Sequence, residues 1–254
     1  MSGSLSFSAE DDDAGCRVLT ATGTLDRKSA PKLRLTLLKA LAEQPAAVLV
    51  DLARVRLTDP LALTVFTAVG RQAAMWPGIP VALCAPAPVL AAALSRGIHR
   101  RLPVHPSVVA ARADIARRHV PPQTVSDELL PVAGAARHAR DLVTDACVRW
   151  EIPHLVFPAS LAVSELVSNA VQHARTMVTL RLSLRPRHLL VAVQDGSPDE
   201  PVIRPTPGPS ADGRDGGRGL PLVAALALHW GSLPTAGGKV VWASFPLGDP
   251  AGDA

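Results

Sequence analysis

One stretch of the chain, Ser164 to Ala174, carries side chains that could bind a metal ion and a phosphate. If this stretch is helical, residues four apart differ by only about 40° in direction, so Glu165, Asn169 and His173 form one polar edge. Asn169 could give its carbonyl oxygen to Mg²⁺, a hard cation that keeps waters and binds phosphates. Glu165 could orient a nucleophilic hydroxyl or water and accept its proton. The spacing alone is more typical of a solvated helix edge, because polar pairs four residues apart are common.

Two further segments could complete a nucleotide site. Asp195 and Gly196 follow an apolar run of the strand type. A carboxylate at a strand end could accept from an exocyclic amine such as that of adenine, and a glycine lets the backbone approach a flat ring closely. The alternative is an ordinary Asp-Gly turn. The glycine-rich run 216–219 leads directly into a helix, where exposed backbone N–H groups and the helix dipole favour phosphate.

The first half of the chain alternates strand and helix signals. Short apolar runs are separated by segments with apolar residues at helical spacing. Asp59-Pro60 is a helix start, because Asp can cap free N–H groups and Pro suits a first turn. The alternation predicts a small α/β domain with a largely covered sheet. We expect strands at 17–22, 48–50 and 81–85, and helices that begin at 29–31, at 59–60, at 89 and at 106. The apolar face of the first helix is formed by Leu33, Leu37, Ala40 and Leu41. The apolar face of the second helix is formed by Leu61, Val65, Ala68 and Val69.

A second domain of different topology follows the first. Residues 120–124 are the best linker candidate, because two adjacent prolines lie among polar residues. We therefore expect domains at 1–119 and 128–254, joined by a linker at 120–127. In the second domain two helices precede the strands and a third helix is inserted, which predicts an α/β sandwich. Helices are expected at 135–150, 158–174 and 220–228, strands at 178–184, 189–194, 230–233 and 239–245, and a long loop at 197–219.

Composition and charge exclude several classes of function. Aromatic residues make up 3% of the 254 residues, too few for an RNA platform of stacked rings. The net charge of +4 is modest and the basic residues are scattered, so no direct nucleic-acid partner is expected. Cys16, Cys84 and Cys147 lack metal-binding spacing, which favours reduced, buried thiols. The uncharged stretch 72–95 is interrupted by prolines, and the N-terminus is polar. We therefore expect no membrane span, no signal peptide and a cytoplasmic location.

The order and spacing of the three segments resemble the GHKL ATPase superfamily, and most closely its bacterial anti-sigma-factor serine kinase branch, over residues 128–247. The resemblance implies a Bergerat ATP-binding sandwich with ATP and Mg²⁺ as cofactors. It implies that Asn169 holds Mg²⁺, Glu165 is the catalytic base and Asp195 reads adenine. It also implies that residues 197–216 form an ATP lid. The matching nucleotide-binding positions are Asn169, His173, Asp195, Gly196, Gly217, Arg218, Gly219 and Leu220.

Two features qualify this resemblance. Histidine kinases share the ATPase domain but carry an upstream phosphoacceptor helix, and His138 in Ala-Arg-His-Ala-Arg lacks that context. The family often has a threonine near the end, after Gly-Lys or Gly-Thr, which helps to hold a water on the adenine side. Here Gly238-Lys239 is followed by Val240 and Val241, so the resemblance implies no such contact.

The first half is similar to STAS domains, the fold of anti-sigma-factor antagonists, over residues 5–118. The similarity lies in Gly23-Thr24-Leu25-Asp26 after a strand, in Val50-Asp51-Leu52 and in Asp59 at a helix start. In phosphorylated antagonists the helix opens Asp-Ser-Ser-Gly-Leu, and the second serine is the acceptor. The matching residue here is Leu61, which has no hydroxyl. We therefore expect this domain to be a docking or regulatory module rather than a kinase substrate.

The two resemblances together predict an ATP-binding anti-sigma regulator with serine/threonine kinase activity toward a separate antagonist. Its expected partners are a sigma factor, a STAS-type antagonist or both, and the resemblance makes a homodimer plausible. A catalytically silent module, in which ATP only orders the lid, is the alternative. A protein-interaction scaffold with neither activity is a third. The presence of Glu165 and Asn169 favours the kinase over the silent module, since binding alone needs no base.

Overall fold

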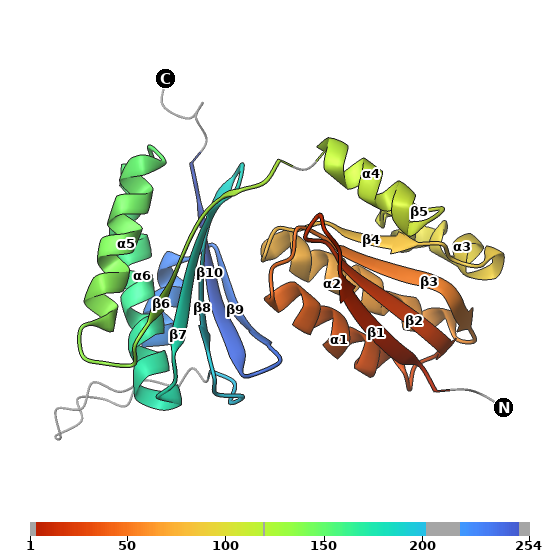
Figure 1. The fold of residues 1–254 in the computed structure, drawn as a ribbon, viewed down its shortest axis with the longest axis horizontal. Helices are drawn as coiled ribbons and strands as arrows, with labels where there is room; N and C mark the ends of the chain where they lie inside the picture. Colours follow the sequence, from red (N-terminus) through yellow and green to blue (C-terminus); the bar gives the residue numbers. More distant parts are fainter. Residues whose placement is uncertain (1–3, 119, 202–218, 249–254) are drawn as a thin grey trace. The chain divides into compact units, whose positions relative to one another are not determined.

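The computed structural model describes residues 4–118, 120–201 and 219–248. The chain divides into two compact units, Met1–Pro121 and Pro122–Ala254, each with its own sheet (Figure 1). Each unit is therefore described by itself.

The first unit contains a mixed five-stranded sheet in the order β1-β2-β3-β4-β5. Strand β1 (Ser6–Asp11) pairs antiparallel with β2 (Arg17–Leu25). Strands β3 (Val48–Leu57), β4 (Val81–Cys84) and β5 (Val104–His105) then follow in parallel register. Parallel neighbours need a crossover connection, and helices between the strands supply it.

Four helices cover this sheet (Figure 1). They are α1 (Ala30–Ala42), α2 (Thr64–Met75), α3 (Pro88–Leu94) and α4 (Val108–Arg118). Helix α4 packs on one face through a cluster that includes Leu49. The residues on either side of Leu49 point to the opposite face and are also fully buried, so both faces of the sheet are covered. The predicted α/β class of this half is confirmed.

The apolar face predicted for α1 is buried, but the face predicted for α2 is only partly correct. Val65 and Val69 are buried, whereas Ala68 is exposed and Leu61 keeps 60% of its surface exposed. The reason is that the segment opens with a 3-10 turn, Pro60–Leu63, before the α-helix begins. A 3-10 turn has three residues per turn, so Leu61 is out of phase with the helix that follows.

The second unit contains an antiparallel sheet in the order β6-β7-β8-β10-β9. Its strands are β6 (Gln123–Leu129), β7 (Val178–Leu184), β8 (His188–Asp195), β9 (His229–Pro234) and β10 (Lys239–Pro246). Alternate residues of these strands point to the same face, which makes one face of the sheet continuously apolar.

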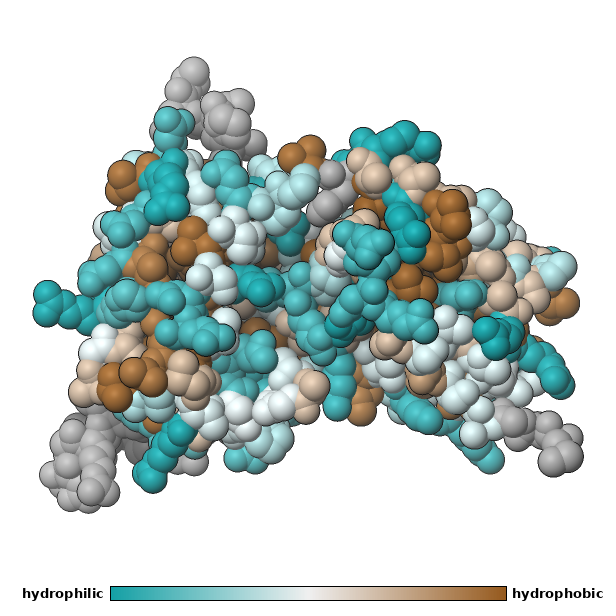
Figure 2. Space-filling view, in the orientation of Figure 1, coloured by the Kyte–Doolittle hydropathy of each residue, from teal (hydrophilic) through white to brown (hydrophobic). Residues whose placement is uncertain are grey.

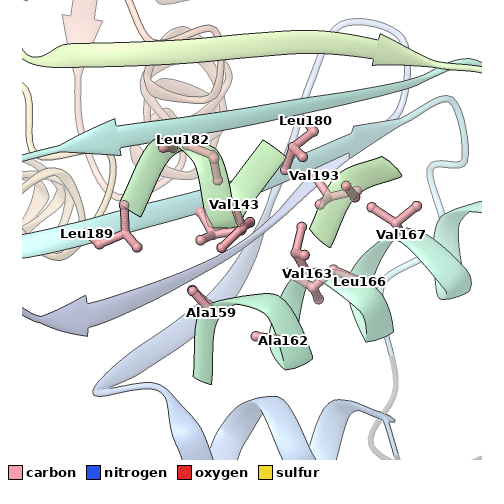
Figure 3. Close-up of a cluster of buried hydrophobic side chains, with 14 of the residues drawn as sticks. Val143, Ala159, Ala162, Val163, Leu166, Val167, Leu180, Leu182, Leu189 and Val193 are labelled. Carbon is pink, nitrogen blue, oxygen red and sulfur yellow. The ribbon is translucent and has the colours of Figure 1, made fainter. Parts of the chain in front are cut away.

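Helices α5 (Ala135–Arg149), α6 (Val156–Asn169) and α7 (Gly219–Leu226) bury that apolar face. In Figure 3, side chains of α6 point toward those of β7 and β8. The predicted sandwich of helices on an antiparallel sheet is confirmed. The residues at the centre of this core are Val143, Ala159, Ala162, Val163, Leu166, Val167, Leu180, Leu182, Leu189 and Val193.

Two polar edge strands differ from the prediction. The predicted linker at 120–127 overlaps β6, which pairs with β7 along its whole length. Strand β1, in the polar N-terminal stretch, was not predicted. Both strands are mostly exposed at the edge of a sheet, so neither carries the apolar run by which a buried strand is found.

The polarity of the surface, the cysteines and one apolar helical segment can be compared with what the composition predicted. Hydrophilic residues cover much of the face shown in Figure 2, with hydrophobic residues in separate groups between them. Cys16, Cys84 and Cys147 are free and buried, as predicted. One helical segment among the described residues, Pro153–Ala174, is long and apolar enough to cross a membrane by length and composition. Five α6 residues of this segment are buried in the second unit, so its apolar side chains pack in the core of that unit.

Candidate functional site

Helix α6 positions the first two candidate residues. Glu165 and Asn169 lie one turn apart at the C-terminal end of the helix, and both are half-buried. Ala162, Val163 and Leu166 anchor the other face of the helix in the core. A carboxylate and a carboxamide are therefore held on a rigid element, as the predicted roles of base and Mg²⁺ ligand require.

His173 lies beyond the end of α6, in a turn of a different kind. After Asn169 the chain widens into a π-helical turn, Ala170–Ala174, and the Arg175 N–H donates to the carbonyl five residues back, at 3.3 Å. His173 lies within this wider turn and is exposed, and its part in nucleotide binding stays a prediction. Such turns are rare and frequently lie at functional sites.

Asp195 ends strand β8, as predicted, and is 5% exposed. Its Oδ1 accepts from the Ser197 N–H at 2.8 Å and from the Lys239 ammonium at 2.9 Å. Lys239 is the register partner of Asp195 on strand β10. Nothing in the sequence pattern pairs Lys239 with Asp195, because strand register is what brings them together.

Gly196 makes a close contact that was not predicted. Its N–H donates to the Thr176 hydroxyl at 2.8 Å, and a Cβ at Gly196 would lie 2.8 Å from the Thr176 methyl group. Thr176 follows the π-helical turn, so this contact ties the end of α6 to the end of β8. The approach of Gly196 to a flat ring stays a prediction.

Gly219 begins helix α7 and lies directly against Glu165. A Cβ at this position would be 2.6 Å from Glu165 Oε2, so only glycine allows this approach. The N-terminus of α7, where phosphate is favoured, therefore lies beside the predicted base. Leu220 is 8% exposed and packs in the core, and its part in nucleotide binding stays a prediction.

Several predicted residues lie outside the described part of the chain. These are Gly217, Arg218 and most of the predicted lid at 197–216. Among the described residues, no three His, Cys, Asp or Glu side chains gather into a metal site of their own. Mg²⁺ is ordinarily held by one or two protein oxygens together with phosphates and water, so Asn169 is a sufficient kind of ligand.

The residues present fit a magnesium nucleotide. Close approaches at glycines hold the segments together: Gly219 against Glu165, and Gly238 against Asp195, where a Cβ would lie 2.0 Å from the backbone oxygen. Within the described residues, Asp195 Oδ2 has no recorded donor. Among the described residues, nothing therefore competes with an amine of a base for that oxygen.

A cavity of about 780 Å³ lies elsewhere, entirely within the first unit. Its lining is mainly apolar, with Arg71, Arg100 and Arg101 among the charged residues. It contains none of the predicted nucleotide-binding residues, so it plays no part in the site described here.

The two units match two family models. Residues 8–96 match the STAS domain described as "Mlab, STAS domain", and residues 132–245 match the histidine kinase-like ATPase domain. The chain therefore carries a STAS-like unit followed by a unit that matches the histidine kinase-like ATPase domain. A domain of the latter kind implies ATP binding, and the combination supports a partner-switching regulator. No curated protein matches the chain.

Several solved structures are similar to part of the chain. An anti-sigma factor antagonist from Mycobacterium paratuberculosis is 25% identical over 44% of this chain and 95% of its own, with a TM-score of 0.38. The unphosphorylated form of the anti-sigma factor antagonist SpoIIAA is 17% identical over 45% of this chain and 99% of its own, with a TM-score of 0.36. RsbS from Moorella thermoacetica, in a variant form, is 17% identical over 44% and 95%, with a TM-score of 0.37.

Proposed function

We propose that this protein is a cytoplasmic, ATP-dependent anti-sigma regulator that phosphorylates a serine or threonine of a separate STAS-type antagonist. The observation that carries the proposal is the contact between Gly219 and Glu165. It joins the helix start that favours phosphate to the carboxylate that can accept a hydroxyl proton. A module that only bound nucleotide would have no use for a base at that position.

Each residue has a distinct part in this proposal. Bound ATP supplies the phosphoryl group, with Mg²⁺ to neutralise its charge. Asn169 would hold the metal ion, and Asp195 would accept from the adenine amine. Glu165 would orient the antagonist hydroxyl and accept its proton as the new P–O bond forms and the bond to the leaving ADP oxygen breaks. The backbone N–H groups at the start of α7 would hold the phosphates.

The STAS unit would serve as a docking or regulatory module that is not itself phosphorylated. Leu61 lies at the start of the second helical segment, is 60% exposed and has no hydroxyl. Asp59 caps this turn by accepting from the Leu61 N–H at 2.9 Å. The unit thus retains a capped and exposed helix start, which suits protein contact, without a hydroxyl at the position that matches the acceptor; the nearby Thr58 and Thr64 are the alternative acceptors, and labelling of either would contradict this part of the proposal.

The test is phosphotransfer from labelled ATP to a purified STAS-domain protein that has serine at the position matching Leu61. We expect the full chain to label that protein in the presence of Mg²⁺, and to leave its own residues 1–121 unlabelled. Glu165→Gln, which keeps the size of the side chain but removes the base, should abolish transfer and leave the Kd for ATP within about threefold. Transfer that survives in Glu165→Gln would show that the base is another residue.

A second outcome separates the kinase from the silent binding module. If the wild-type chain binds ATP but transfers no phosphate to any STAS-domain protein tested, the proposal of kinase activity fails and ATP only gates binding. Asn169→Ala is a useful companion variant, because loss of the metal ligand should weaken ATP binding in Mg²⁺ much more than in EDTA.

A further inference from the structure

Lys239 is a buried lysine that the proposed function leaves without a role. Its side chain is 10% exposed and that of Asp195 is 3% exposed. The ammonium donates to Asp195 Oδ1 at 2.9 Å and to the Ser197 carbonyl oxygen at 3.3 Å. Lysine is rarely buried to this extent without a specific charge partner, and here that partner is the carboxylate predicted to read the base.

The strand register puts Lys239 on the face of the sheet that forms the site. Val191 and Val193 on β8, and Val241 and Ala243 on β10, all pack in the core beneath the helices. Because alternate residues of a strand share a face, Asp195 and Lys239 continue these two rows on the same face. Both side chains therefore lie at the end of the helix-covered face, where β8 leads toward the predicted lid.

Among the described residues, the hydrogen bonds leave one oxygen of Asp195 and one N–H of Lys239 without a partner. Asp195 Oδ1 is engaged by the Ser197 N–H and by Lys239, whereas no described residue donates to Oδ2. The Lys239 ammonium has three N–H bonds, and its two recorded partners leave the third. Together the two side chains offer an oxygen that accepts and a nitrogen that donates.

We propose that Lys239 is a base-recognition residue that donates a hydrogen bond to the ring nitrogen N1 of adenine while Asp195 accepts from the adjacent amine. This rests on the proposed ATP site. The adenine edge carries an amine donor beside the N1 acceptor, which complements the acceptor and donor of the pair. Guanine carries a carbonyl oxygen in place of the amine, and that oxygen would face the Asp195 carboxylate. The pair therefore selects adenine over guanine by charge as well as by shape.

If the ion pair between Lys239 and Asp195 is purely structural, a different result is expected for nucleotide affinity. It would hold β8 to β10 and leave nucleotide affinity indifferent to the ring nitrogen. A pair that closed the site would weaken binding, and its removal would tighten the Kd. The affinity for a nucleotide that lacks only N1 separates base recognition from the other two roles, and the Kd after replacement of Lys239 separates those two from each other.

The experiment is calorimetric binding of ADP, 1-deaza-ADP and GDP to the full chain in Mg²⁺. We expect the wild-type protein to bind 1-deaza-ADP on the order of tenfold or more weakly than ADP, as for a lost hydrogen bond to a charged group, and to bind GDP more weakly still. Lys239→Met should bind ADP about as weakly as the wild type binds 1-deaza-ADP, and should not distinguish ADP from 1-deaza-ADP. Lys28→Met, at an exposed lysine of the first unit, is the matched control and should behave as the wild type.

Equal affinity of the wild-type chain for ADP and 1-deaza-ADP would overturn the proposal, and so would a Lys239→Met variant that binds ADP as well as the wild type or more tightly. The comparison of analogues on the wild-type chain needs no mutation, so it decides the matter even where Lys239→Met does not fold. If the wild-type chain binds no nucleotide, the proposed ATP site itself fails, and the role of Lys239 fails with it. That result differs from equal affinity for ADP and 1-deaza-ADP, which would overturn the role of Lys239 and leave the ATP site in place.

Discussion

Replacing Gly219 with alanine would place a methyl carbon 2.6 Å from Glu165 Oε2. Ordinary van der Waals contact begins at 3.4 Å, so the carboxylate would have to move by about 0.8 Å (3.4 minus 2.6). The atom that moves is the far end of a flexible side chain, so the fold should tolerate the change. Gly219 also lies in a helix, where alanine is preferred to glycine. The substitution therefore displaces the proposed base at little cost to the free energy of unfolding.

The effect on phosphotransfer should be much larger than the effect on binding. A displacement of about 1 Å at a catalytic group can cost about 100-fold in rate, which corresponds to roughly 2.7 kcal/mol of transition-state stabilisation. The alanine keeps its backbone N–H, so the contribution of α7 to phosphate binding is retained. We expect single-turnover transfer from ATP to fall about 100-fold, with a Kd for ATP within about threefold of the wild-type value.

Gly237→Ala is the matched control, because a Cβ there meets no atom within 4 Å. It should transfer phosphate at the wild-type rate. The urea midpoint of each variant shows whether the fold is retained. A Gly219→Ala variant that is folded, binds ATP and transfers phosphate at the wild-type rate would refute the assignment of Glu165 as the base.

Three further outcomes test the structure around the site. Leu182→Ala removes a fully buried side chain of the second core and should lower the free energy of unfolding by about 2–5 kcal/mol, measured by urea titration; a change below 1 kcal/mol would contradict the packing. Asp59→Ala removes the acceptor for the Leu61 N–H and should cost about 1 kcal/mol, most of which Asp59→Asn should restore if capping is the cause. Burial raises the pKa of the Cys84 thiol to about 12 and that of the Cys147 thiol to about 11. At pH 8 both should therefore be alkylated by iodoacetamide far more slowly in the native protein than in urea, as followed by mass spectrometry, and equal rates would contradict their burial.

Much of the fold was predictable because the buried elements carry strong periodic signals. Helix α6 is an example: Ala162, Val163, Leu166 and Val167 recur at helical spacing, and all four are buried. The edge strands gave no such signal, since β1 and β6 are polar and largely exposed. Their existence depends on backbone hydrogen bonds to a neighbour, which the side-chain pattern does not record.

The sequence was enough to propose which residues form the site, but not which of them contact one another. Glu165 and Asn169 lie one turn apart as expected, but His173 depends on a π-helical turn, which no residue pattern marked. The ion pair between Lys239 and Asp195 depends on the register of two strands separated by 44 residues. In the sequence, the start of β10 was notable only for a threonine that the family often has and this chain lacks. In the structure, a lysine ammonium lies beside the carboxylate that would read the base. Valines follow Gly238-Lys239 where the family often has the threonine, so the polar group beside Asp195 is the ammonium of Lys239 itself, and its consequence should be seen in which base the site accepts.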